Sequence, residues 1–136
     1  MSLIVPPTTP EEHFIGMLNT LLMRGYEAYQ NYLKNGKTLL HAKIIKTNNE
    51  QTLDLILSNC HLLPSEQQKD LINLVSHLDT WICQWNDLHE RTKPSLTDTF
   101  VFETAVNFPK ESMDRLSKYF ASKLQPQHSL NENSGY

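Results

Sequence analysis

Apolar residues recur at intervals of three and four over long stretches of this chain of 136 residues. That spacing places side chains on one face of an α-helix, whereas a strand places every second residue on one face. Glycine occurs only four times, so turn signals are too few for an all-β sandwich. The pattern therefore predicts a mainly α protein, a small antiparallel bundle of about four helices, built as one domain over residues 9–124.

The first expected helix covers Pro10 to Lys34. Thr9 suits the N-cap, proline is tolerated at the first helical position, and Gly36 provides the conformation needed just past the end. Gly25, in the middle, indicates either the close approach of another backbone or a slight weakening of the helix. Its apolar residues are spaced mostly at threes and fours: Phe14, Met17, Leu18, Leu21, Leu22, Ala28, Tyr29, Tyr32 and Leu33.

The clearest element runs from Glu66 to about Arg91. Ser65 is the expected N-cap, with Gln68 completing a capping box. Its apolar face comprises Leu71, Leu74, Val75, Leu78, Ile82, Trp85 and Leu88, and the residues lying mostly off that face are Lys69, Asp70, Asn73, Asp87 and Glu90. A last helix begins at Pro109 and presents one further apolar face made of Met113, Leu116, Tyr119, Phe120 and Leu124.

Residues 37–63 allow two interpretations. Thr47 to Glu50 match a capping box, which favours a break and a restart there. The alternative is one long helix with a stripe made of Ala42, Ile45, Asn49, Leu53, Ile56 and Cys60.

Residues 96–108 show the alternation of a strand, although Ser95 with Asp98 could instead cap a short helix. A lone strand has unpaired backbone groups, so it would need a partner from residues 38–46 or from a second chain. The sequence does not decide between a short extended segment near residues 99–106 and a short helix.

The two ends are expected to lie outside the bundle. Residues 1–8 contain Pro6 and Pro7 and predict an extended arm, and residues 125–136 predict a disordered polar tail. We find no signal peptide, no lipidation motif and no apolar run long enough for a membrane span. Two cysteines are too few for a disulfide scaffold, so both are expected to be reduced in a cytoplasmic protein.

No catalytic motif is present in the sequence. The scattered glycines exclude phosphate-binding loops and hydrolase elbows, and there is no C-x-x-C or H-E-x-x-H motif. Residues six apart on a helix point in different directions and cannot converge on one metal. We therefore expect no cofactor, no metal and no small-molecule substrate, with the cysteines as small buried apolar residues and the histidines at the surface or at its boundary with the core. The residues concerned are Cys60, His61, His77, Cys83 and His89.

Aromatic residues gather on three of the expected elements, and tyrosine and tryptophan are enriched at the centres of protein interfaces. The broad apolar side of the first helix is explained either by a central position in the bundle or by contact with another subunit. Trp81 at the edge of its helix face is either core or an anchor for a partner. The candidate interface residues are Tyr26, Tyr29, Tyr32, Trp81, Trp85, Phe100 and Phe102.

A basic stretch runs between Glu27 and Glu50 without an intervening acid. Its lysines either contact an anionic partner or form a solvated segment. The net charge of −3 argues against general nucleic-acid binding. The candidate contacts are Lys34, Lys37, Lys43 and Lys46.

These observations favour a non-enzymatic protein–protein interaction module, such as an adaptor, a chaperone-like protein or a regulatory bundle. It is expected to bind a partner protein or to self-associate as a homodimer. Two alternatives stay open: a nucleic-acid-linked regulator using residues 34–46, and a metal-binding protein or thiol enzyme built on the cysteines and histidines.

Overall fold

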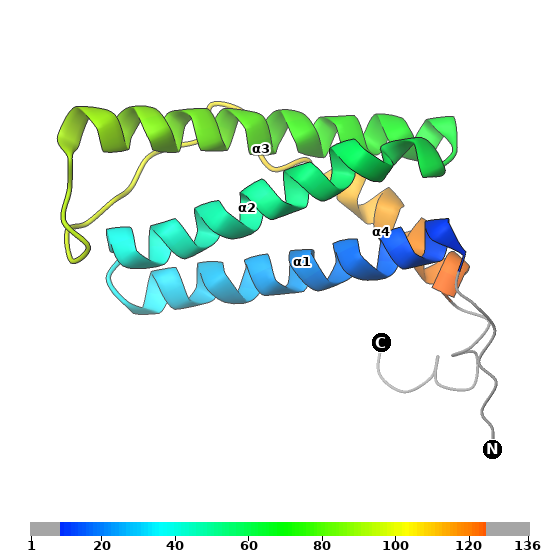
Figure 1. Ribbon diagram of the computed structural model, residues 1–136, viewed down its shortest axis with the longest axis horizontal. Coiled ribbons are helices and arrows are strands. Elements are labelled where there is room, and N and C mark those ends of the chain that lie inside the picture. The colour runs from blue at the N-terminus through cyan, green and yellow to red at the C-terminus, as the bar shows by residue number, and fades with distance from the viewer. Residues whose placement is uncertain (1–8, 125–136) are drawn as a thin grey trace, which may run out of the picture.

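The computed structural model describes residues 9–124 as a bundle of four α-helices (Figure 1). This confirms the predicted fold class. The helices are α1 (Pro10–Lys34), α2 (Leu39–Asn59), α3 (Ser65–Thr92) and α4 (Lys110–Leu124). A 3₁₀ turn, Cys60–Leu62, links α2 to α3. The predicted N-terminal arm (1–8) and polar tail (125–136) lie outside the described residues.

The helix α2 lies between α1 and α3, and the three run in alternating directions (Figure 1). The shorter α4 packs on α3 and α1 at the end of the bundle where α1 begins. The larger core lies at that end, and all four helices contribute to it through Phe14, Ile15, Leu18, Ile56, Leu71, Leu74, Val75, Leu78, Met113, Leu116 and Phe120. The first halves of the apolar faces predicted for the first and third helices, together with the face of the last helix, therefore meet in one core.

The helix starts differ in how well the sequence predicts them. At α1, the Thr9 hydroxyl accepts the Glu12 N–H at 3.0 Å and the Glu12 carboxylate accepts the Thr9 N–H at 3.0 Å. At α3 the predicted cap is wrong, because Pro64 holds the N-cap position and Ser65 is already helical. The Gln68 side chain instead donates to the Leu63 carbonyl at 2.7 Å, so it provides a hydrogen-bond partner for the backbone of the preceding turn.

The predicted break in α2 is wrong, since one helix continues through Thr47 to Glu50. Two polar residues on its buried side make this possible. The Asn48 side chain donates to the Leu21 carbonyl of α1 at 3.0 Å, and the Thr52 hydroxyl donates to the Asn48 carbonyl at 2.8 Å. The buried stripe therefore includes Asn48 and Thr52 where the sequence suggested Asn49 and Leu53.

Charged and polar side chains pin α4 to its neighbours. Asp70, predicted to lie off the apolar face, is instead buried at 6 % exposure and accepts from the Arg115 guanidinium at 2.8 Å. These hydrogen bonds hold the pKa of Asp70 below its ordinary value. On the other side, the Tyr119 hydroxyl donates to Glu11 at 2.5 Å, and burial together with that carboxylate raises the pKa of Tyr119 to about 12.

Replacing Gly25 with alanine is expected to destabilise the protein by about 1–3 kcal/mol, the usual cost of overpacking. A Cβ at this position would lie 2.7 Å from the Asn48 side-chain nitrogen, which is held by its hydrogen bond to Leu21. Urea unfolding of Gly25→Ala, Asn48→Ala and the double variant measures the effect. In the Asn48→Ala background the same alanine should be neutral or stabilising; an unchanged penalty there would contradict this explanation.

The depressed pKa of Asp70 gives its ion pair a defined pH dependence. Because the folded-state pKa is below the unfolded value, the pair stabilises the fold above pH about 4 and that contribution is lost as the pH falls through the folded value. Thermal unfolding between pH 2 and 7 should therefore show a shallower acid decline for Asp70→Asn than for the wild type. Asp79→Asn, which replaces an exposed carboxylate of the same helix, is the control.

Candidate functional site

The segment that returns from α3 to α4, residues 93–109, is extended along part of its length and forms no helix. Its one bridge joins Thr99 to Thr38. The Leu39 N–H donates to the Asp98 carbonyl at 2.8 Å, and the Phe100 N–H donates to the Lys37 carbonyl at 2.9 Å. The extended interpretation of residues 99–106 is thus correct near the start of that segment. The residues that pair with it lead into α2.

Side chains of α3 hold the rest of this segment. The Gln84 amide donates to the Glu103 carbonyl at 2.9 Å and accepts the Ala105 N–H at 2.7 Å. The His77 ring nitrogen lies 2.8 Å from the Val106 carbonyl oxygen. These two side chains therefore substitute for a neighbouring strand.

A second, smaller core forms beneath the segment. Phe100 and Trp85 are 2 % and 3 % exposed, and their ring centroids lie 4.9 Å apart. The Trp85 indole donates to the Ala42 carbonyl at 3.2 Å, and His89 stacks on the same indole at 5.1 Å. Trp85, a candidate interface residue, is thus a core residue that a partner cannot reach in this fold.

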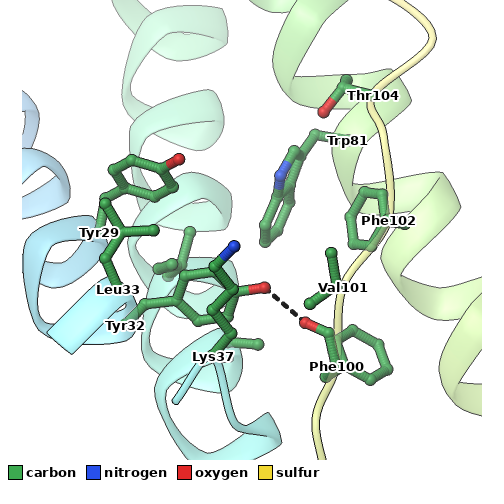
Figure 2. Close-up of a pocket in the computed structure, with 11 residues that line it drawn as sticks. Tyr29, Tyr32, Leu33, Lys37, Trp81, Phe100, Val101, Phe102 and Thr104 are labelled. Atoms are coloured by element: carbon green, nitrogen blue, oxygen red, sulfur yellow. Dashed lines mark hydrogen bonds between the residues drawn. The ribbon is translucent and has the colours of Figure 1, made fainter. Parts of the chain in front are cut away.

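An aromatic cleft of 210 Å³ opens above this core, between the end of α1 and the return segment (Figure 2). Six residues singled out in the sequence meet there: Tyr29, Tyr32, Lys37, Trp81, Phe100 and Phe102. The sequence did not point to five further lining residues, which are Leu33, Ala42, Ile45, Val101 and Thr104. Their signals were the alternation of the return segment, the spacing of the α1 face and, for Ala42 and Ile45, the stripe of the long-helix alternative for residues 37–63.

One hydrogen bond joins two residues that line the cleft on opposite sides, Tyr32 of α1 and Phe100 of the return segment. The Tyr32 hydroxyl donates to the Phe100 carbonyl at 2.6 Å, as the dashed line in Figure 2 shows. Burial, with a smaller contribution from Tyr29, raises the pKa of Tyr32. The two tyrosine rings stack with centroids 6.1 Å apart. Tyr32 therefore fixes the distance between α1 and the return segment.

The cleft exists because α4 covers only part of one α1 face. Residues three or four apart share a helix face, and such a face runs through Glu11, Ile15, Leu18, Leu22, Tyr26, Tyr29 and Leu33. Its first half is covered, with Ile15 and Leu18 at 0 % exposure. Beyond α4, Tyr26, Tyr29 and Leu33 are 67 %, 48 % and 40 % exposed.

The four candidate lysines have different surroundings. The Lys46 ammonium lies 4.4 Å from the centre of the Trp85 ring and 3.8 Å from the Glu50 carboxylate. Lys37 lines the cleft and adopts a left-handed backbone conformation, with φ of 55°. Lys34 and Lys43 are exposed.

The cysteines and histidines do not converge. Cys60 is half-buried, and that burial raises its thiol pKa, whereas Cys83 is exposed, which corrects the expectation that both are buried. Over residues 9–124, no three His, Cys, Asp or Glu side chains are grouped as a metal site. In the same range, no helix combines the length and apolar character needed to cross a membrane.

Comparison of this chain with protein-family models, with curated proteins and with solved structures found no match. The cleft and the uncovered α1 face are therefore the features from which a function can be inferred.

Removing the Tyr32 hydroxyl should loosen the return segment without unfolding the bundle. Tyr32→Phe is expected to cost about 0.5–1.5 kcal/mol, the net contribution of one hydrogen bond. Amide hydrogen exchange should speed up at Phe100 and Ala105, whose N–H groups are hydrogen-bonded in the return segment, and stay unchanged at Leu71 in the main core. Equal acceleration at all three sites would mean that Tyr32 does not act locally.

Proposed function

We propose that this protein is a non-enzymatic interaction module that self-associates through the uncovered face of α1. One observation carries the proposal: a single helix face is buried in the main core at Ile15 and Leu18 and is exposed at Tyr26, Tyr29 and Leu33. Exposed aromatic residues adjoining a buried apolar face mark interaction surfaces. The cytoplasm, expected from the sequence, remains the proposed location.

A second copy is a suitable occupant because the exposed part of this face carries no charge. Two identical faces can meet around a twofold axis without placing like charges opposite each other. In an antiparallel arrangement centred on Tyr29, each Tyr26 would face the Leu33 of the other copy. Large tyrosine rings would then be buried at the centre of the interface, where they contribute most.

The alternative functions gain no comparable support. The basic stretch proposed to contact an anionic partner loses Lys46, whose ammonium lies against Trp85 and Glu50. The alternative of a thiol enzyme or metal protein would need thiolate character at Cys60, whose pKa is raised. Neither alternative is favoured by an arrangement of the described residues.

The mass in solution tests the proposal. Light scattering over a concentration series should show the mass rising from 15.7 kDa toward twice that value. Tyr26→Glu changes the most exposed residue of this face and should weaken the dimer about thirtyfold, as expected for an interface hot spot.

Leu57→Glu is the matched control. The exposed fraction of Leu57, 58 %, is similar to the 67 % of Tyr26, but Leu57 lies on α2 outside the proposed interface. It should leave the dimer intact. A mass of 15.7 kDa at every concentration, or equal weakening by both substitutions, would contradict self-association through α1.

A further inference from the structure

One wall of the aromatic cleft is the edge of an extended backbone. In such a chain, the N–H and C=O groups of one residue point to one side and those of the next residue point to the other. Phe100 directs both groups toward Lys37 and Tyr32. Glu103 and Ala105 bond to Gln84 on the opposite side. By this alternation, Phe102 and Thr104 share the edge of Phe100 and face the cleft.

Beyond Phe100, the backbone groups on this edge lack hydrogen-bond partners among the described residues. Within residues 9–124, the backbone N–H and C=O groups of Phe102 and Thr104 have no hydrogen-bond partner. An edge of this kind pairs readily with another extended chain, because backbone groups gain hydrogen bonds in register. The cleft therefore offers four backbone groups alongside its aromatic side chains.

Charge selects among the chains that could add to this edge. Lys37 is the only charged residue among those that line the cleft. Of the residues that the structure describes, none places a carboxylate within 4.0 Å of the Lys37, Lys34 or Lys43 ammonium. An occupant with a carboxylate would complete this side of the cleft.

A second copy of the same segment fits this edge poorly. Antiparallel pairing of Phe102 with Thr104 of another copy would place the two Glu103 side chains directly opposite each other, and like charges in that position are destabilising.

The volume of the cleft argues for a side chain as its occupant, since 210 Å³ is below the ~300 Å³ at which small-molecule pockets begin.

We propose that the cleft binds an extended acidic segment of another protein, which adds as a strand to residues 102–104. A bulky apolar side chain of that segment enters between Tyr32 and Trp81, and a carboxylate pairs with Lys37. This function is separate from self-association, although Tyr29 and Leu33 border both surfaces.

Selection from a library of random heptapeptides displayed on phage, with the full chain as bait, tests this proposal. The selected peptides should combine Asp or Glu with a bulky apolar residue. Calorimetry with the synthetic peptides should show that N-methylation of alternate backbone amides lowers the affinity about tenfold or more, because each methyl group removes a strand hydrogen bond. Methylation of the intervening amides should have little effect.

Hydrogen exchange and charge variants locate the binding. Peptide should slow amide exchange at Phe102 and Thr104. Lys37→Glu should weaken binding about tenfold, whereas Lys43→Glu, an exposed lysine outside the cleft, should change it less than twofold. Circular dichroism confirms that both variants retain the helical fold.

Three results would overturn the strand-addition proposal: no enrichment of peptides, binding that N-methylation leaves unchanged, or protection at sites other than Phe102 and Thr104. Because Tyr29 and Leu33 border both surfaces, the selection is made with the wild-type chain and with Tyr26→Glu, which weakens the dimer and lies outside the cleft. A wild-type chain that dimerises, together with a Tyr26→Glu chain that selects no such peptide, overturns this inference alone. A monomer that binds the peptides overturns self-association alone.

Discussion

The mismatch in length between α3 and α4 determines the shape of this bundle. By the rise of an α-helix, α3 with 28 residues spans about 42 Å and α4 with 15 residues about 22 Å. The chain must therefore travel back along α3 before the last helix can begin. The fourth position of the bundle is filled by a helix at one end and by an extended segment at the other, and the aromatic cleft lies where neither covers α1.

The extended return segment needs support that a helix would supply for itself. Backbone groups in an α-helix bond within the helix, whereas those of an extended chain require neighbours. Here the neighbours are the turn before α2, the Tyr32 hydroxyl and the Gln84 amide. His77 and His89 belong to the same support, since one lies against a backbone carbonyl and the other stacks on the Trp85 indole beneath the segment. Two of the three histidines that raised the question of a metal, His77 and His89, thus have packing partners in the fold.

The sequence predicts α1, α3 and α4 well because an apolar stripe and a fixed start or stop coincide in each. It fails for α2, where Asn48 and Thr52 lie on the buried side and Leu40, Ile44 and Leu57 are exposed, so periodicity carries no clear signal. Five aromatic members of the cleft are recognisable by residue type. Their convergence on one cleft cannot be recognised from the sequence, because it depends on how far α4 extends along α1. The helical pattern of α1 does not reveal how much of that helix a neighbouring helix will cover.

The contact between Tyr119 and Glu11 joins residues 108 positions apart, and it has a consequence for synthesis. A chain made from its N-terminus presents α1 and α2 as a pair long before α4 emerges. During that interval Ile15 and Leu18, which are completely covered in the finished fold, have no α4 side chains against them. The nascent protein consequently exposes more apolar surface than the folded one, and it is more prone to aggregation until α4 has emerged from the ribosome.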